Sequence, residues 1–406
     1  MAKGKILEVT KDVKWIGILD PDLKVFDIIM ETEFGTTYNS YFINAEKKAI
    51  VETAKENFKE EYLEKVKGVV NPEEIEYIIL NHTEPDHSGS LKHLLKIAPN
   101  ATVVGSGNAL RYLADMVGFE FKSQRIKDGD VLNLGNKKIR FIGAPNLHWP
   151  DSMYSYLEED KILFTCDSFG AHYCDERMFD DEVDNFDAAY KYYFDVILRP
   201  FSKFMLKAID KISELDIDMI CPGHGPVLRS NWKKYVDMAK EFSMQEMSKR
   251  EADGIRVFIP YVSAYGYTKQ IATAIAKGIK DAGDMEVELC DIQDKSFHFL
   301  DEKIAGATAL VVGSPTFNQN ILPQVYQLFA SINPIRDVAK PFAAFGSYGW
   351  SGEGVGIIEN ALTTLRLKQI IEGLRLKFSP LPDQFRILHD FGKEIGNRLI
   401  QDNKTS

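Results

Sequence analysis

The alternation of apolar and polar stretches divides the chain into two parts. The first part mixes strand-like and helix-like patterns, and the second alternates short, continuously apolar runs with helical segments. The second pattern is typical of βα units around a parallel sheet. Between the two parts, residues 234–253 have the pattern of a charged amphipathic helix that ends before Gly254. The sequence therefore predicts two domains, 1–253 and 254–406, both of the α/β class.

The strand and helix patterns can be assigned to particular segments. In the first part, strands are predicted within 36–52, 76–81, 137–145 and 161–169, and helices over 88–99 and along the run 184–215. In the second part, strands are predicted over 256–263, 285–292, 309–315 and 341–347.

Charge and composition exclude several classes of protein. With 49 Lys and Arg against 60 Asp and Glu, the net charge is −11, which opposes binding to nucleic acid or to an anionic membrane. The 45% hydrophobic and 27% charged residues are normal for a folded globular protein. No apolar run approaches the ~20 residues of a membrane span, and the first residues do not form a signal peptide pattern. We therefore expect a cytoplasmic protein.

The cysteines and histidines are distributed differently along the chain. The four cysteines, at positions 166, 174, 221 and 290, form no Cys-x-x-Cys pair, so we expect no rubredoxin-type module in this chain. Of the 8 histidines, only His298 and His389 follow residue 250. Histidine chemistry is therefore expected in the first part.

Polar residues with metal-ligating side chains follow several predicted strands of the first part. One strand runs into a sequence that contains two imidazoles and two carboxylates, and single residues follow three later apolar runs. These residues are His82, Glu84, Asp86 and His87, then His148, Asp167 and His224. A lone histidine is more often structural, but strand ends that are distant in sequence can meet on one rim of a sheet. Together they predict a metal site, and seven ligands would suffice for two ions.

Three loops of the second part follow its first, third and fourth predicted strands. They comprise Ser263, Ala264, Tyr265, Gly266, Tyr267 and Thr268; Ser314, Pro315, Thr316, Phe317 and Asn318; and Ser347, Tyr348, Gly349, Trp350, Ser351 and Gly352. The first loop precedes a helical pattern, where hydroxyls and free backbone N–H groups can bind a phosphate. Aromatic and Asn side chains in the other two could contact a flat ring. The structural alternative is that these residues are ordinary helix caps, turn formers and core aromatics.

These motifs carry a family resemblance. The order of the seven ligand candidates resembles the metallo-β-lactamase fold, with Glu84 where hydrolytic members usually have His. That replacement, and the segments 147–153 (LHWPDSM) and 168–176 (SFGAHYCDE), resemble the flavodiiron proteins. The three loops resemble the FMN site of flavodoxin, with a departure at Tyr265, where flavodoxins commonly have Thr. The resemblance implies an N-terminal metallo-β-lactamase-like αβ/βα sandwich and a C-terminal flavodoxin-like doubly wound parallel sheet.

The resemblance also implies cofactors and an activity. His82, Glu84 and His148 would hold one iron, and Asp167 would bridge it to a second iron held by Asp86, His87 and His224. FMN would bind at the three loops. The family reduces dioxygen to water, nitric oxide to nitrous oxide, or both, with electrons from an external donor, either rubredoxin or the reduced 8-hydroxy-5-deazaflavin coenzyme. A head-to-tail homodimer or dimer of dimers is expected. His172 would supply a hydrogen bond or a proton, with a purely structural role as the alternative.

Two other functions remain open at this point. The first is a dinuclear zinc hydrolase of the metallo-β-lactamase fold with an appended flavodoxin domain, which metal content and hydrolysis would reveal. The second is an electron carrier in which FMN is the only active centre and the metal is structural. Replacing Glu84 or Asp167 would separate the carrier from the reductase, because oxygen consumption by a carrier would not change.

Overall fold

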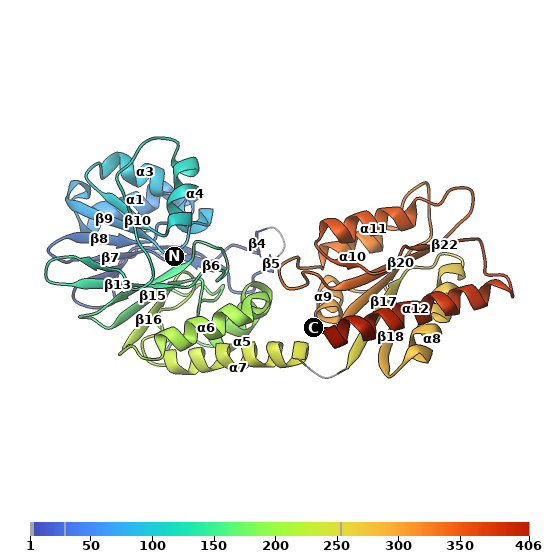
Figure 1. Cartoon of the computed structure of the whole chain (residues 1–406). Coiled ribbons are helices and arrows are strands. Elements are labelled where there is room, and N and C mark those ends of the chain that lie inside the picture. The colour runs from blue at the N-terminus through green and yellow to red at the C-terminus, as the bar shows by residue number, and fades with distance from the viewer. Residues whose placement is uncertain (1–3, 28–29, 252–253, 406) are drawn as a thin grey trace. The chain divides into compact units, whose positions relative to one another are not determined.

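The structure, a computed structural model, describes residues 4–27, 30–251 and 254–405. The chain separates into two compact units, Met1–Met247 and Ser248–Ser406, called here the N-terminal and the C-terminal unit (Figure 1). The predicted boundary between residues 253 and 254 adjoins residues that lie outside the described ranges, and it stays a prediction.

The N-terminal unit contains two main sheets. The first has the order β1-β2-β7-β8-β9-β10-β11 and changes from antiparallel to parallel pairing at β8. Its strands are β1 (Leu7–Glu8), β2 (Val13–Trp15), β7 (Tyr41–Ile43), β8 (Lys48–Val51), β9 (Ile75–Leu80), β10 (Thr102–Gly105) and β11 (Ser123–Arg125). The second sheet, in chain order, comprises β12 (Val131–Asn133), β13 (Lys138–Gly143), β14 (Met153–Leu157), β15 (Ile162–Cys166) and β16 (Met219–Pro222). Two separate two-stranded sheets also belong to this unit: β3 (Ile18–Asp20) with β6 (Thr36–Tyr38), and β4 (Val25–Phe26) with β5 (Met30–Glu31).

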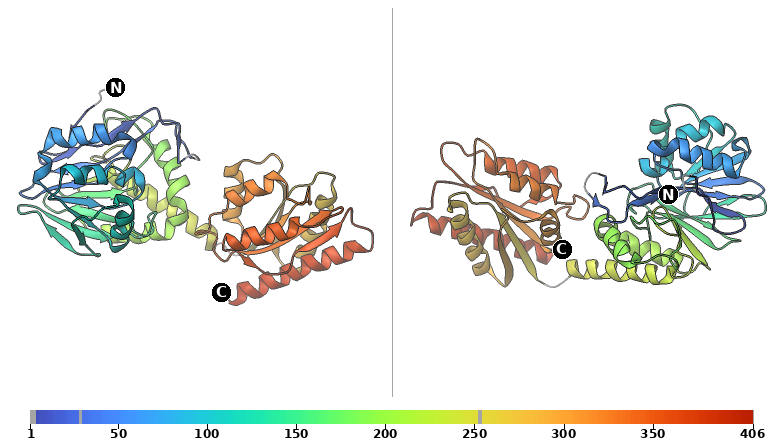
Figure 2. Two further views of the ribbon diagram at one scale, coloured as in Figure 1. Left: turned by 90° about the horizontal axis from the view of Figure 1, so that it is seen from above. Right: turned by 180° about the vertical axis from the view of Figure 1, so that it is seen from behind.

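The two sheets pack face to face between two layers of helices. Tyr41 of the first sheet and Phe164 of the second lie in the shared core, with ring centroids 5.2 Å apart. Helices α1, α3 and α4 cover the first sheet, and α5, α6 and α7 cover the second (Figures 1 and 2). The helices are α1 (Lys59–Val69), α2 (Pro85–Ser88), α3 (Leu91–Ile97), α4 (Gly107–Val117), α5 (Phe186–Tyr193), α6 (Ser202–Ile212) and α7 (Trp232–Glu251).

Helix α4 shows how local sequence sets an element of this unit. The Ser106 hydroxyl accepts a hydrogen bond from the backbone N–H of Ala109 and so caps the first turn. Gly118 follows the last turn with a φ of 74°, a conformation that glycine adopts without strain. Leu113 and Val117, one turn apart, are buried against the first sheet.

The predicted helical run 184–215 is interrupted. A π-helical turn (Phe194–Leu198) and a 3-10 turn (Arg199–Phe201) separate α5 from α6. Pro200 lacks a backbone N–H, so a regular α-helical hydrogen bond cannot form at this position. The run is helical as predicted, but it is divided into two helices.

The C-terminal unit is built around one parallel sheet of order β18-β17-β19-β20-β21, with β22 also paired to β20. Counted from its own first strand, this is the 2-1-3-4-5 order of flavodoxin-like sheets. Its strands are β17 (Ile255–Tyr261), β18 (Met285–Asp291), β19 (Ala309–Gly313), β20 (Pro341–Tyr348), β21 (Lys368–Gln369) and β22 (Leu374–Lys377). Its helices are α8 (Tyr267–Ala282), α9 (Phe297–Gly306), α10 (Pro323–Ala330), α11 (Gly354–Thr364) and α12 (Gln384–Thr405).

The helices of this unit lie on both faces of the sheet. Apolar residues of α8 and α12 form one core against it, and those of α9, α10 and α11 form the other. Among the described residues, no helix combines the length and the apolar character needed to cross a membrane.

Glycines permit the close contact between α8 and α12. A Cβ atom added at Gly278 would overlap the backbone carbonyl oxygen of His389, and one added at Gly392 would overlap that of Ile275. By contrast, a Cβ added at Gly306, the last residue of α9, would meet no atom within 4 Å.

We expect Gly278→Ala to destabilise the C-terminal unit by about 1–3 kcal/mol, the usual cost of overpacking, since the overlapping atom belongs to rigid backbone. Gly306→Ala, which makes the same chemical change in open space, should leave stability unchanged or slightly raised. Urea unfolding of the two variants, followed by circular dichroism, measures the difference. Equal stability of both variants would contradict this account of the helix contact.

Candidate functional site

The seven predicted metal ligands lie together at one end of the β-sandwich. Their ligand atoms form two groups, and within each group all these atoms lie within 4.8 Å of one another. The first group is His82, Glu84, His148 and Asp167, and the second is Asp86, His87 and His224. His82 and Glu84 follow β9, and Asp86 and His87 lie in the short helix α2 that comes next. His148 lies in the β13–β14 loop, Asp167 follows β15 and His224 follows β16.

In the first group, two imidazoles face two carboxylates. Glu84 Oε2 lies 2.8 Å from His148 Nε2 and 3.2 Å from His82 Nε2. Asp167 Oδ2 lies 3.3 Å from the same nitrogen of each histidine. Four ligand atoms from three chain segments therefore lie around one small volume.

In the second group, Asp86 Oδ2 lies 3.2 Å from His224 Nε2 and 3.4 Å from His87 Nε2. The other carboxylate oxygen of Asp167, Oδ1, lies 2.9 Å from His87 Nε2 and 3.6 Å from His224 Nε2. Asp167 thus presents one oxygen to each group.

The electrostatics of the site follow from burial and from the mixture of acids and imidazoles. Burial alone would lower the pKa of His148, but the adjacent carboxylates of Asp167 and Glu84 raise it to about 9. Burial would likewise raise the pKa of Asp167, but the charges of His87 and His82 hold it well below its usual range. The same opposition raises the pKa of His87 and lowers that of Asp86. Carboxylates and imidazoles stabilise one another's charged forms here.

Several buried polar atoms of the cluster have no hydrogen-bond partner among the described residues. They are both carboxylate oxygens of Asp86, Oδ2 of Asp167 and Nδ1 of His87. An unpaired buried acceptor is costly, and a coordinated cation satisfies it. Three carboxylates with four imidazoles suit a redox-active metal such as iron better than an imidazole-rich set does. The residues present therefore fit a pair of iron ions.

Two histidines are held so that Nε2 faces the cluster. His224 Nδ1 lies 2.6 Å from the backbone oxygen of Thr37, and His82 Nδ1 lies 3.4 Å from Asp151 Oδ2. The same Asp151 oxygen accepts hydrogen bonds from the backbone N–H and the hydroxyl of Thr83, both at 2.8 Å. Partners of this kind orient imidazole ligands. Sequence reasoning missed Asp151, although it lies within the segment LHWPDSM that carries the family resemblance.

Glu52 was also missed. It follows β8, is only 2% exposed, and accepts a hydrogen bond at 2.9 Å from the backbone N–H of Asn81, the residue before His82. Burial raises its pKa well above the usual range. Ser155 of β14 donates to the Asn81 side chain at 2.5 Å, so this buried network joins strands from both sheets below the cluster. A charged residue at the end of the apolar run KAIV was the available signal.

His172 lies beside the cluster but outside both groups. Its Nδ1 is 3.0 Å from Thr36 Oγ1, and its ring centroid is 5.2 Å from that of His224. Burial holds the pKa of His172 well below its usual range, so the ring is neutral. Its Nε2, like the Tyr193 hydroxyl, has no partner among the described residues. A third group of potential ligands includes Cys166, but burial raises the pKa of that thiol well above its usual range, which disfavours a thiolate.

The three loops of the C-terminal unit meet at the carboxyl end of its sheet. Thr268 Oγ1 of the first loop lies 2.9 Å from Ser347 Oγ of the third, and the backbone N–H of Thr316 in the second donates to Ser347 O at 2.8 Å. Gly266, with a φ of 80°, precedes the first residue of α8. The loops therefore form one site at the switch point of the sheet, where ligands bind in this architecture.

The loop side chains divide into buried hydroxyls and exposed aromatics. Thr268 and Ser347 are buried, whereas Tyr265 and Trp350 are 79% and 76% exposed and Phe317 is 52% exposed. The Ser263 hydroxyl accepts from the backbone N–H of Lys269 in the first turn of α8. Their exposure shows that these aromatic side chains are not part of the core. Together with the N-terminus of α8, they fit a flat, phosphorylated ligand such as FMN.

Comparison with known proteins agrees with the fold. Residues 36–225 match the protein family described as ODP family beta lactamase, and residues 259–387 match the flavodoxin family. These matches confirm the predicted β-lactamase-like and flavodoxin-like folds.

Full-length relatives and solved structures carry both units. The flavo-diiron protein FprA2 of Clostridium acetobutylicum is 38% identical over 97% of this chain and 99% of its own length. The type A flavoprotein fprA of Rhodobacter capsulatus is 37% identical over 96% of this chain and 91% of its own. The flavodiiron protein from Giardia intestinalis superposes with a TM-score of 0.66 at 29% identity, covering 99% of this chain and 98% of that one. The rubredoxin oxygen:oxidoreductase from Desulfovibrio gigas gives 0.70 at 26%, covering 99% and 100%.

The family resemblance inferred from the sequence is thus confirmed by similarity along nearly the whole chain, and this protein belongs to the flavodiiron protein family.

Proposed function

We propose that this protein is an oxidoreductase that uses FMN and a diiron centre to reduce dioxygen to water, nitric oxide to nitrous oxide, or both. The observation that carries the proposal is Asp167, whose two carboxylate oxygens face two separate groups of ligand atoms in a chain that also has a flavodoxin-like loop site. The names of two relatives, a flavo-diiron protein and a rubredoxin oxygen:oxidoreductase, support it.

The ligand assignment follows the two groups. His82, Glu84 and His148 would hold one iron, Asp86, His87 and His224 the other, and Asp167 would bridge them. Three carboxylates favour iron in its oxidised state, and Glu84 in place of an imidazole works in the same direction. When bound, FMN and iron supply the electron-transfer chemistry that no side chain in the site can supply.

The protein's own residues hold the proposed metal ligands in position. Asp151 and the backbone of Thr37 fix two imidazole rings, and the Glu52–Asn81 hydrogen bond holds the backbone that leads to His82. Most of the cluster is buried, with only Glu84 and His148 partly exposed, and burial strengthens the electrostatic interactions inside it. His172 remains neutral and lies beside His224, where its Nε2, which has no partner among the described residues, can accept a hydrogen bond.

The FMN assignment uses all three loops. The N-terminus of α8, with Ser263 and Thr268, would receive the phosphate, and Tyr265 and Trp350 would pack on the ring system. The electron donor is proposed to be rubredoxin or the reduced 8-hydroxy-5-deazaflavin coenzyme. The name of the Desulfovibrio gigas relative supports the former.

Replacing Glu84 by Gln tests the diiron reductase. The variant should lose at least tenfold in iron affinity, because it removes an anionic ligand, and its reduced form should be oxidised by dioxygen or nitric oxide correspondingly more slowly. Stopped-flow oxidation by each gas, with iron, zinc and FMN quantified in the same sample, gives the measurement.

Glu56→Gln is the matched control, since Glu56 pairs with His93 at 2.9 Å outside both ligand groups. It should retain wild-type iron content and rates. Unchanged oxygen consumption in Glu84→Gln would instead favour the electron carrier, and zinc with ester hydrolysis in the wild type would favour the hydrolase.

Replacing Trp350 by Ala tests the FMN site. Loss of an aromatic contact of about 0.5–1.5 kcal/mol should weaken FMN binding roughly two- to tenfold. Phe297, which is 50% exposed at the start of α9 and outside the three loops, provides the control variant Phe297→Ala. FMN titration of the stripped proteins, followed by flavin fluorescence, distinguishes them. The same FMN affinity in both variants would argue against this site.

We further propose that the working enzyme is a head-to-tail homodimer or a dimer of dimers, in which FMN of one subunit serves the irons of another. Each cofactor site lies wholly within one unit. The FMN site of one chain can therefore be combined with the metal site of another. Turnover per chain should therefore fall when the protein is diluted below its dimer dissociation constant, as checked by activity and by analytical ultracentrifugation on one dilution series. A monomer with full turnover would disprove the dimer.

A further inference from the structure

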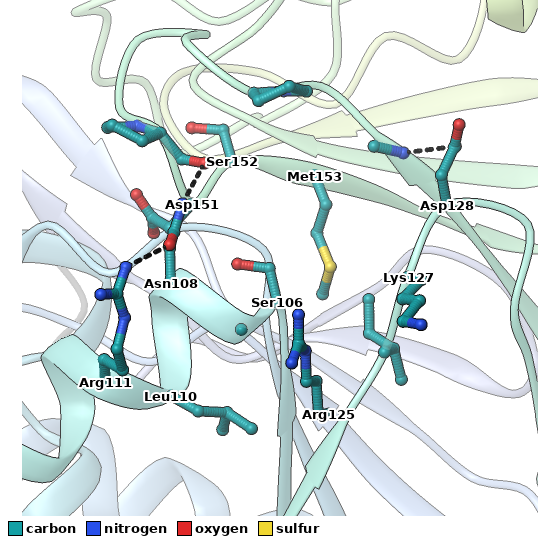
Figure 3. Close-up of a pocket in the computed structure, with 15 residues that line it drawn as sticks. Ser106, Asn108, Leu110, Arg111, Arg125, Lys127, Asp128, Asp151, Ser152 and Met153 are labelled. Atoms are coloured by element: carbon teal, nitrogen blue, oxygen red, sulfur yellow. Dashed lines mark hydrogen bonds between the residues drawn. The ribbon is translucent and has the colours of Figure 1, made fainter.

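A cavity of about 570 Å³ lies in the N-terminal unit and is distinct from the metal cluster, because none of the seven ligand residues lines it. It is bounded by the start of α4, by the chain that continues from β11, and by the segment between β13 and β14 (Figure 3). Nothing in the proposed function uses it.

One side of this cavity is basic, although the whole chain carries a net charge of −11. Arg111, Arg125 and Lys127 line it, and within the described ranges no carboxylate forms an ion pair with Arg125 or Lys127. The acid on the same edge, Asp128, is already bonded to the backbone N–H of Gly143 and, at 2.9 Å, to Lys211 Nζ. The cavity therefore has cationic charge that its own walls do not neutralise.

The position of Arg125 adds to this excess. Its guanidinium lies against the first residue of α4, so that a Cβ on Gly107 would come within 2.7 Å of Arg125 Nε (Figure 3). The first N–H groups of a helix lack acceptors within it, and its N-terminus carries partial positive charge. The Ser106 cap satisfies only the N–H of Ala109. A guanidinium at this end of a helix is stable next to an anion and unfavourable without one.

The loop side of the cavity provides a different chemistry. Asp151 and Ser152 line it and are 1% and 4% exposed, yet Asp151 Oδ1 and Ser152 Oγ have no hydrogen-bond partner in the part of the chain that the structure describes. Asp151 Oδ2 is occupied by Thr83 and His82. A buried carboxylate oxygen beside a hydroxyl is satisfied by a hydrogen-bond donor, which a fully deprotonated anion cannot provide.

We propose that this cavity binds a small phosphate monoester that also bears hydroxyl groups, of the sugar phosphate or nucleotide class. The phosphate contacts Arg125, Lys127 and the start of α4, as anions do at helix N-termini, and a ligand hydroxyl donates to Asp151 Oδ1. Leu110 and Met153 supply apolar contact between the two ends. The cavity volume falls within the usual range for small-molecule sites.

Isothermal titration calorimetry of the holoprotein tests the proposal, with ribose 5-phosphate, ribose and inorganic phosphate as three separate titrants. Ribose 5-phosphate should bind saturably and more tightly than either fragment. Arg125→Gln and Lys127→Gln should each weaken it about tenfold or more, the loss of one charge-assisted hydrogen bond. Lys122→Gln removes the same charge from a residue outside the cavity lining and should leave affinity unchanged.

Gly107→Ala gives an independent variant whose folding is not at risk. The new Cβ would displace only the flexible end of Arg125, so the helix should be as stable as before or more so, while binding weakens. Absence of binding, affinity unchanged in Arg125→Gln and Gly107→Ala, or binding of inorganic phosphate as tight as that of ribose 5-phosphate would overturn the proposal. None of these outcomes bears on FMN or iron content, so it can fail while the proposed function stands.

Discussion

The N-terminal unit depends on compensation of the negative charge of three buried acids at one end of its β-sandwich. Glu84, Asp86 and Asp167 could not remain ionised in such a buried place without the imidazoles or the proposed metal cations around them, since burial by itself raises the pKa of each carboxyl group. This balance explains why so many segments are fixed there. Each contributes one or two charged groups, and removing any one leaves a partner buried without compensation.

The sequence was informative about which residues lie in the site because strand ends are recognisable. An apolar run followed by a histidine or an acid, as before His82, Asp167 and His224, indicates a side chain at the rim of a sheet, and the structure brings those rims together. The supporting residues were less visible. Asp151 and Glu52 act through hydrogen bonds to groups distant along the chain, and no local periodicity distinguishes them from surface acids. The break in 184–215 was missed because apolar spacing continues through Pro200.

The C-terminal unit was easier to predict, since each strand of a doubly wound sheet is short, apolar and followed by a loop at the same edge. What the sequence could not indicate is how the loops are joined. The backbone oxygen of Ser347 accepts a hydrogen bond from the backbone N–H of Thr316, and its hydroxyl contacts the Thr268 hydroxyl. One serine therefore connects all three loops. The sequence pattern alone also gave no sign that Tyr265 and Trp350 would lie mostly in solvent rather than in the core.

The distribution of ligand residues over both sheets has a consequence for how the unit folds. His82 and His87 are near neighbours in the chain, whereas Asp167 and His224 follow strands of the second sheet, so we expect them to join the cluster only when that sheet packs against the first. Contacts between residues so distant in sequence carry a large loop-closure entropy, and they form late in folding. A partly folded chain therefore offers at most a fragment of the ligand set. We therefore expect tight retention of metal only late in folding, once the whole ligand set has been assembled.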